Sequence, residues 1–362
     1  MALKPVTEEF INELKLVLSP GAVLAVPDNY LSEPRSRWRG ISSILVLPQN
    51  VKEVSAIVSL ANAQNIPIIP YGGGTGLVGG QIQDKGPSGI LLSLERMNKI
   101  TSLNLDENVI TVEAGVILSN LRDEAEKVKR IFPLSLASEG TAQIGGNLAT
   151  NAGGVNVLRY GSTRNLCLGL EVVFADGSIW NGLSRLHKDN TGYDLKNLII
   201  GSEGTLGIIT AATMKLFSKP LEHTVALIAV KSPKDALRLL SETKDYFGET
   251  ISAFELINKM GIDFFNETKV EVKVPFSNIP EWMVLLDIGH PGRNSVEKNT
   301  NDYFENILSS GLAVDGVLAE NVGQQNDLWA LRENIPEANL SLIHISEPTR
   351  QEAISYAVFC LK

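Results

Sequence analysis

Short apolar runs alternate with stretches of helical spacing along the first half of the chain. The run at residues 44–47 predicts a strand, and the apolar positions of residues 51–64 recur at helical spacing after Asn50, a suitable N-cap. Further strands are predicted at residues 66–69, 89–94 and 109–113, a helix at 118–128, and a hairpin joining 168–174 to 178–180 across Asp176 and Gly177. A short helix at 7–18 precedes an irregular segment that reaches Gly40. The pattern indicates an α+β domain.

The second half of the chain has a different predicted pattern of strands and helices. Strands are predicted at residues 225–230, 282–288 and 314–320, and helices at 233–246, 296–308 and 326–338, with an additional helix at 254–265. Ser232 and Pro233 suit the N-cap and first position of a helix. Strands separated by single helices are typical of a small, largely antiparallel sheet with a helical cover.

Composition limits the classes of partner. The chain has 362 residues, of which 44% are hydrophobic, enough for two domains. A net charge of -9 without any block of basic residues argues against nucleic acid or an anionic membrane, and favours a small-molecule partner. Two cysteines and four scattered histidines form no disulfide framework and no metal-binding spacing, so we expect a cytoplasmic location and assign no metal. No apolar run approaches the roughly 20 residues of a transmembrane segment.

The first candidate site is a loop from Pro70 to Gly80 that contains six glycines. Bare backbone after an apolar run can close on a phosphate. Gly74, Gly76 and Gly79 match the dinucleotide fingerprint, with Glu95 following at about the spacing of its acidic residue. Residues 81–89 lack a helical period, however, so the loop is predicted to bind phosphate without a helix behind it. An NAD-dependent Rossmann dehydrogenase is kept as an alternative.

Two more glycine-rich stretches follow, at residues 138–154 and 200–209. Separate glycine loops in one chain indicate a long, flat ligand. Hydroxyl and amide side chains accompany the glycines of the second stretch and suit the edges of a heteroaromatic ring. Tyr160, in Arg159-Tyr160-Gly161, offers a stacking or polar contact, with simple packing as the other interpretation.

Together with residues 188–195, these three stretches closely resemble the FAD-binding domain of the vanillyl-alcohol oxidase type flavoproteins. Within that family the chain is most similar to the D-2-hydroxy-acid dehydrogenases, the group of D-2-hydroxyglutarate dehydrogenase, D-lactate dehydrogenase and the FAD subunit of glycolate oxidase. The resemblance covers residues 41 to 338. It implies an N-terminal segment (1–40), a two-subdomain FAD-binding domain (41–220) and an incomplete α+β cap domain with a largely antiparallel sheet (221–339).

The resemblance also implies which residues bind the cofactor. The first stretch would hold the FAD pyrophosphate, the second the isoalloxazine and ribityl chain, and the third the adenine end. Some relatives attach flavin through a histidine where this chain has Thr75, so non-covalent FAD is expected. The implied FAD-binding residues are Tyr71, Gly72, Gly73, Gly74, Thr75, Gly76, Leu77, Ser138, Gly140, Thr141, Gly145, Gly146, Asn147, Thr150, Asn151, Gly153, Gly154, Tyr160, Gly161, Glu203, Gly204, Gly207 and Ile209.

The implied reaction is oxidation of a small D-2-hydroxy acid (D-lactate, D-2-hydroxyglutarate or glycolate) to the 2-oxo acid, with hydride transfer to flavin N5. Arg332 matches the family's substrate-binding arginine, and a planar guanidinium suits a carboxylate. The electron acceptor is left open between an electron-transfer protein, an iron–sulfur subunit and a quinone.

The family's histidine-rich catalytic segment is expected after Arg332 and is absent, so a divalent metal is expected only in a full-length parent. Residues 341–350 resemble the translation of a sequencing adapter. We therefore expect residues 340–362 to be a non-native tail on a truncated chain. A non-catalytic flavin-binding fragment is the second alternative.

Overall fold

The computed structural model describes residues 2–268, 271–290, 292, 296–336, 338 and 358–360. The chain separates into two compact units. Unit 1 comprises Met1–Gly153 and Gly161–Ser218, and unit 2 comprises Gly154–Tyr160 and Lys219–Lys362. The sequence did not predict that the short segment 154–160 belongs with the second unit.

The first sheet of unit 1 is mostly parallel. Its order is β1 (Val23–Leu24), β2 (Ile44–Val46), β4 (Ile90–Ser93), β3 (Ile68–Tyr71), and β4 pairs in parallel with both β2 and β3. The same part of unit 1 contains helices α1 (Glu8–Val17) and α2 (Val51–Gln64). The short helix η1 (Asp28–Tyr30) lies in the otherwise irregular stretch before Gly40. Asn50 caps α2 as predicted, because its side chain accepts from the backbone N–H groups of Lys52 and Glu53.

The second sheet of unit 1 is antiparallel throughout. Its order is β5 (Ile100–Asn104), β6 (Val109–Glu113), β10 (Ile208–Lys215), β8 (Cys167–Val173), β9 (Ile179–Gly182). The predicted β8–β9 hairpin is confirmed. The remaining elements are α3 (Leu118–Lys127), α4 (Ile144–Ala149), α6 (Thr163–Leu166), α7 (Leu195–Ile199) and the pair β7 (Arg130–Ile131) and β11 (Phe217–Ser218). Two sheets in one unit confirm the predicted two-subdomain organisation.

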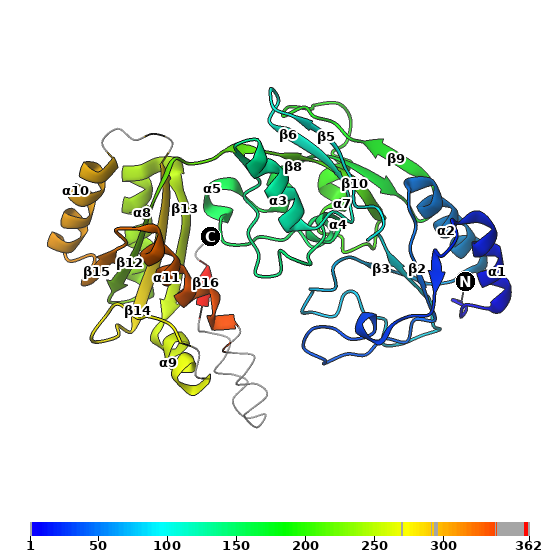
Figure 1. The fold of residues 1–362 in the computed structure, drawn as a ribbon, viewed down its shortest axis with the longest axis horizontal. Coiled ribbons are helices and arrows are strands. Elements are labelled where there is room, and N and C mark those ends of the chain that lie inside the picture. The colour runs from blue at the N-terminus through cyan, green and yellow to red at the C-terminus, as the bar shows by residue number, and fades with distance from the viewer. Residues whose placement is uncertain are drawn as a thin grey trace. The chain divides into compact units, whose positions relative to one another are not determined.

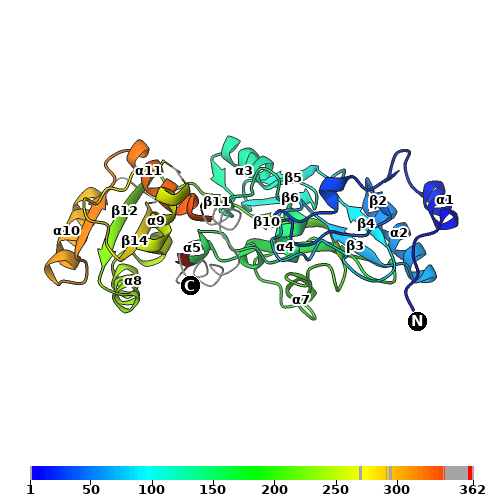
Figure 2. The ribbon, with the colours of Figure 1, turned by 90° about the horizontal axis from the view of Figure 1, so that it is seen from below.

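Unit 2 contains one antiparallel sheet, in the order β15 (Asp315–Leu318), β12 (Glu222–Val230), β14 (Trp282–His290), β13 (Ile251–Asn258), β16 (Val358–Cys360). Its helices are α5 (Val157–Tyr160), α8 (Pro233–Phe247), η2 (Gly248–Thr250), α9 (Lys259–Thr268), α10 (Val296–Ser309) and α11 (Val322–Glu333). Figure 2 shows α8 on one side of β12 and β14, with α9 and α11 on the other. The predicted antiparallel sheet is confirmed. Within residues 340–362 only β16 is described, so the interpretation of that segment otherwise lies outside the described residues.

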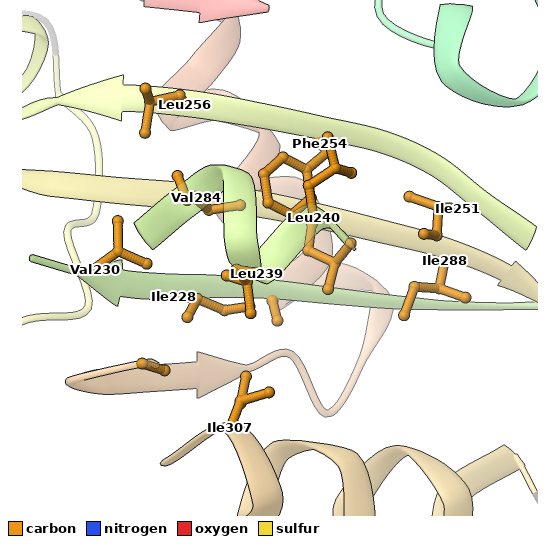
Figure 3. Close-up of a cluster of buried hydrophobic side chains, with 14 of the residues drawn as sticks. Ile228, Val230, Leu239, Leu240, Ile251, Phe254, Leu256, Val284, Ile288 and Ile307 are labelled. Carbon is orange, nitrogen blue, oxygen red and sulfur yellow. The ribbon is translucent and has the colours of Figure 1, made fainter. Parts of the chain in front are cut away.

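The helix predicted at residues 254–265 is wrong in its first part. Residues Ile251–Asn258 form β13, and α9 begins only at Lys259. One face of the sheet packs on α8 and α10, where Phe254 and Val284 gather with Leu239 and Ile307 (Figure 3). The other face packs on α9 and α11. Because both faces are covered, β13 is buried along its whole length and shows no alternation that would separate it from a helix.

Candidate functional site

A pocket in unit 1 is formed where the three glycine-rich stretches meet. Backbone hydrogen bonds join the second stretch to the third: Gly201 N donates to Leu148 O at 3.1 Å, and Glu203 N donates to Ala149 O at 2.9 Å. The pocket lining combines bare backbone with a few polar side chains. In Figure 1, α4 of the second stretch lies beside β10, which continues from the third. Stretches separated by about 130 residues in the chain thus build a single site.

The first two stretches approach so closely that only glycine fits between them. A Cβ placed on Gly73 would lie 2.1 Å from Thr141 O, and one on Gly72 would lie 3.3 Å from the Cα of Gly146. Real Cβ atoms do not approach a backbone oxygen to that distance. Gly73 is therefore required for the contact between the loops, whereas a Cβ at Gly72 would require a small shift of its neighbour.

The loop of the first stretch is held by a side chain that sequence analysis did not assign. Gln81 Nε2 donates to Gly76 O at 2.8 Å and, more weakly, to Gly74 O at 3.4 Å. Gly74 adopts a left-handed φ of 70°, which favours glycine. Residues 77–89 contain no helix, as predicted. The helix N-terminus that a Rossmann site needs is therefore not provided, and Glu95 accepts a hydrogen bond from the Tyr30 hydroxyl instead of lining the pocket.

Tyr71 forms one wall of the pocket at the end of β3. Its ring centroid lies 4.8 Å from that of Tyr30. Burial, and to a smaller extent the nearby Glu95 carboxylate, raise the pKa of Tyr71, so its hydroxyl is neutral at physiological pH. A neutral phenol can present an apolar ring and a hydrogen-bond donor to a ligand.

The second stretch supplies an unsatisfied acceptor. Asn147 lies in α4, is 5% exposed and lines the pocket, yet its Oδ1 has no hydrogen-bond partner among the described residues. A buried oxygen without a donor costs free energy unless a ligand or water supplies one. An N–H at the edge of a heteroaromatic ring is such a donor, and Gly145 and Gly146 beside it leave room for a flat group.

Glu203 and Gly204 complete the pocket from the third stretch. Both adopt left-handed φ angles, 52° and 78°. The Glu203 carboxylate lies beside Gly80, since a Cβ placed there would be 2.9 Å from Glu203 Oε2. A left-handed backbone is uncommon for glutamate, and here the Glu203 N–H donates to Ala149 O at 2.9 Å.

About half of the predicted FAD-binding residues line the pocket. They are Tyr71, Gly72, Gly73, Gly74, Thr75, Gly76, Gly145, Gly146, Asn147, Thr150, Glu203, Gly204 and Ile209. Those outside the lining are Leu77, Ser138, Gly140, Thr141, Asn151, Gly153, Gly154, Tyr160, Gly161 and Gly207. Their assignment to the cofactor stays a prediction.

Several residues outside the lining have evident structural roles. Asn151 Oδ1 accepts from Ser162 Oγ and Arg164 N, which ties α6 to the second stretch. Gly207 is buried, and a Cβ there would lie 2.7 Å from the Val172 side chain. Tyr160 belongs to unit 2, where the Arg159 guanidinium lies 5.1 Å from its ring centroid.

Other residues that line the pocket follow strands or flank the glycines and were not predicted from the sequence. They are Pro70, Val78, Gly80, Gln81, Leu92, Leu94, Ala114, Gln143, Ala149 and Ile208. A signal was available for some of them, because a ligand loop after one parallel strand places the end of the neighbouring strand, here Leu92 and Leu94, beside it.

Arg332 lies in unit 2 and is held by a carboxylate. Its Nε donates to Glu255 Oε2 at 2.7 Å, and Glu255 is 1% exposed. Among the described residues, no other hydrogen bond of this guanidinium is formed, so Nη1 and Nη2 are available to a ligand. Nearby on α11, Trp329 Nε1 donates to Asp287 Oδ2 at 3.1 Å, and Asp287 Oδ1 is 2.7 Å from His223 Nδ1. The sequence did not predict Glu255 as a partner, because that residue was placed in a helix.

Among the described residues, no group of three His, Cys, Asp or Glu side chains is arranged to hold a metal ion. No helix of the described residues is long and apolar enough to cross a membrane.

Comparison with known proteins matches two family models, one in each half of the chain. The FAD binding domain model matches residues 42–182, and the model of the C-terminal domain of FAD linked oxidases matches residues 219–349. The second match ends within the segment 340–362 that was expected to be non-native.

Among curated proteins, the chain is 37% identical over 339 residues to the mitochondrial D-2-hydroxyglutarate dehydrogenase of Danio rerio, covering 92% of this chain and 62% of that protein. It is 35% identical over 318 residues to the D-2-hydroxyglutarate dehydrogenase of Xanthomonas citri pv. viticola, covering 86% of this chain and 64% of that one. The chain thus spans less than two thirds of the length of these relatives.

Solved structures share the fold at low sequence identity. Alkyldihydroxyacetonephosphate synthase matches with a TM-score of 0.72 at 21% identity, over 94% of this chain and 66% of that one. The p-cresol methylhydroxylase structure matches with a TM-score of 0.72 at 19% identity, over 92% and 71% of the two chains. Bare glycine backbone suits a long cofactor with a flat ring, as does the buried Asn147 Oδ1 in the same pocket, which has no hydrogen-bond partner within the described part of the chain. The chain therefore combines the FAD binding domain with the C-terminal domain of the FAD linked oxidases, and its cofactor is FAD.

Proposed function

We propose that the protein is a dehydrogenase that oxidises a small D-2-hydroxy acid to the corresponding 2-oxo acid. The observation that carries the proposal is the pocket built by three glycine-rich stretches, in a chain whose relatives are named D-2-hydroxyglutarate dehydrogenases. D-2-hydroxyglutarate is the first substrate to test, with D-lactate and glycolate next.

The pocket offers a distinct surface to each part of the cofactor. Gly72 to Gly76 would hold the pyrophosphate with backbone N–H groups, and Gly145, Gly146 and Asn147 would face the flavin ring and ribityl chain. Glu203 and Gly204 would meet the adenine end. Position 75 is a threonine and not the histidine that would form a covalent link, so the FAD would be non-covalent.

Arg332 would bind the substrate carboxylate. Its Nε is engaged with Glu255, which fixes the plane of the guanidinium and leaves the two terminal nitrogens for the two oxygens of a carboxylate. FAD, when bound, accepts the hydride equivalent from the substrate α-carbon. The α-hydroxyl proton must pass to a base, and no described residue is assigned that role.

The electron acceptor would be an electron-transfer protein, an iron–sulfur subunit or a quinone. A cytoplasmic location stays a prediction from the sequence, since several relatives carry "mitochondrial" in their names.

The first test separates cofactor binding from turnover. The absorbance of the purified chain is recorded from 300 to 550 nm before and after acid precipitation, for the wild type and for Gly146→Val. We expect flavin bands that acid releases into the supernatant, and their loss in the variant, because a branched side chain would occupy the pocket wall. A variant that retains its full FAD content would remove Gly146 from the site.

The second test mixes the FAD-loaded chain with each D-2-hydroxy acid under anaerobic conditions, with the L-enantiomer as control where one exists. Bleaching of the flavin near 450 nm by one D-acid alone supports the proposal. Flavin that stays oxidised with every acid, while a longer parent is bleached, favours the alternative of a non-catalytic flavin-binding fragment. Failure of both proteins overturns the proposed function.

A further inference from the structure

A second cavity in unit 1 shares no residue with the FAD pocket. It is lined by the segment from Gly182 to Asn197, by the start of β8, by Arg164 of α6 and by Lys215 at the end of β10. This segment includes residues 188–195, which sequence analysis singled out and the FAD pocket does not use.

Three cationic side chains line the cavity: Arg164, Lys196 and Lys215. None of them forms an ion pair with a carboxylate of the described residues within 4.0 Å. Lys196 Nζ makes one weak contact, to Cys167 O at 3.4 Å, and no hydrogen bond of the Lys215 side chain is formed with a described residue. The two ammonium groups therefore retain most of their donors.

The two lysines are close enough to repel each other. Lys215 follows Met214, which pairs with Cys167 in the sheet, and Lys196 reaches the Cys167 carbonyl from α7. Burial, and then the charge of Lys196, lower the pKa of Lys215. Two partly buried like charges with no carboxylate of the described residues within 4.0 Å are unfavourable unless something else offsets them.

The carboxylates in the lining are already engaged. Asp194 caps α7, accepting from Asn197 N at 3.1 Å and Asn197 Nδ2 at 2.7 Å. Asp189 Oδ1 accepts from Thr191 N at 3.0 Å. Burial opposes the change, but hydrogen bonds from Asn197 and then the charges of Lys196 and Arg164 lower the pKa of Asp194, whereas no described carboxylate shifts the pKa of Lys215. The carboxylates of the cavity therefore offset its positive charge only in part.

The available groups suit one kind of anion. Arg164 spends Nη1 and Nη2 on the backbone carbonyls of Asn197 and Ile200, so its planar fork is not open to a carboxylate. Lysine ammonium groups bind phosphate as point charges, and a phosphate dianion matches two of them. We propose that this cavity binds the phosphate group of a small molecule between Lys196 and Lys215, separately from the FAD site.

The test uses the FAD-loaded chain, so that the cofactor occupies the first pocket. Inorganic phosphate and glycerol 3-phosphate are each titrated by calorimetry into the wild type, Lys196→Gln, Lys215→Gln, Lys215→Arg and Lys52→Gln. Lys52→Gln is the matched control, because Lys52 is exposed on α2 and lies outside the cavity. Flavin absorbance verifies that each variant remains folded and loaded.

We expect saturable binding of one or both probes with a Kd of about 1 mM or tighter, weakened about tenfold or more in each lysine-to-glutamine variant. Lys215→Arg and Lys52→Gln should bind like the wild type. Preference for glycerol 3-phosphate would identify a phosphate ester as the ligand, and preference for inorganic phosphate would identify the free ion. Absence of saturation with both probes, or equal affinity in the wild type and the two glutamine variants, overturns the proposal.

Discussion

Arg332 and Glu255 form a salt bridge of 2.7 Å between α11 and the middle of β13. The carboxylate is 1% exposed, and the guanidinium side chain is 20% exposed. Water therefore reaches the arginine more readily than the glutamate, and a ligand can approach the arginine from the same side. The glutamate depends on the arginine for its counterion.

Removing the arginine should destabilise unit 2. We expect Arg332→Met to lower the free energy of unfolding by about 3 kcal/mol, because it leaves a buried carboxylate unpaired. Urea unfolding followed by tryptophan fluorescence measures the change. The double variant Arg332→Met with Glu255→Leu should recover much of the loss, since no charge is then left in the core.

The exposed pair of Lys273 and Asp327 provides the control for this experiment. Its length is 2.8 Å, similar to that of the buried pair, but the lysine side chain is 83% exposed. We expect Lys273→Ala to cost less than about 1 kcal/mol. Equal losses in Arg332→Met and Lys273→Ala would show that burial does not decide the strength of the Arg332 pair.

Gly73 and Gly140 should respond differently to the same substitution. A Cβ on Gly73 would meet Thr141 O, whereas a Cβ on Gly140 has no atom within 4 Å. We expect Gly73→Ala to lose about 1–3 kcal/mol of stability through overpacking, and Gly140→Ala to change by about 0.5 kcal/mol or less. Thermal unfolding of both variants measures the difference. A Gly73→Ala variant as stable as the wild type would contradict the close approach of the two loops.

The stability of unit 2 should depend on the protonation of His290. Burial, chiefly, and the neighbouring His223 and Arg159 lower the pKa of His290 from its ordinary value of 6.5, against the opposing charges of Glu222 and Asp287. The unfolded chain then binds this proton at a higher pH than the folded chain. The contribution is fully present above the unfolded pKa of about 6.5 and is lost as the pH falls below that value and through the lower pKa of the folded chain.

We therefore expect the free energy of unfolding to decrease between about pH 7 and pH 5, and His290→Gln to flatten this part of the curve. Urea unfolding at a series of pH values measures the slope. His187→Gln, at an exposed position of unit 1, serves as the control. An unchanged slope in His290→Gln would remove this residue as the cause.

Cys167 should be unreactive in the folded chain. It is 2% exposed, and burial raises the pKa of its thiol to about 12 despite the nearby Lys196 and Lys215. We expect iodoacetamide at about pH 8 to leave Cys167 unmodified until the chain is unfolded in urea. Peptide mapping by mass spectrometry distinguishes it from Cys360. Modification of Cys167 at similar rates in the folded and unfolded chain would contradict its burial.

Much of the candidate site could be predicted from glycine placement, because clustered glycines mark bare backbone wherever the chain folds. Gly72 to Gly76 and Gly145 to Asn147 were predicted and line the pocket. Asn151 and Gly207 were predicted by the same logic and lie outside the pocket lining, where one ties α6 to its loop and the other packs on β8, so their contact with the cofactor stays a prediction. Composition of a motif does not separate residues that touch a ligand from residues that hold its loop. The role of Gln81 in holding the first loop was not predicted, because an isolated glutamine gives no local sequence signal of such a contact.

The sequence alone determined the elements whose cause is local. Three such features depend on neighbouring residues: the Asn50 cap of α2, the β8–β9 hairpin, and the irregular conformation after Gly79. The structure confirms all three. Tertiary structure alone decided the pairings between distant positions. The pairing of Glu255 with Arg332 could not be predicted, because a strand that is buried on both faces shows no alternation that separates it from a helix. The contact between Gly73 and Thr141 joins positions that are far apart in the sequence. Close packing leaves no room for a side chain between them.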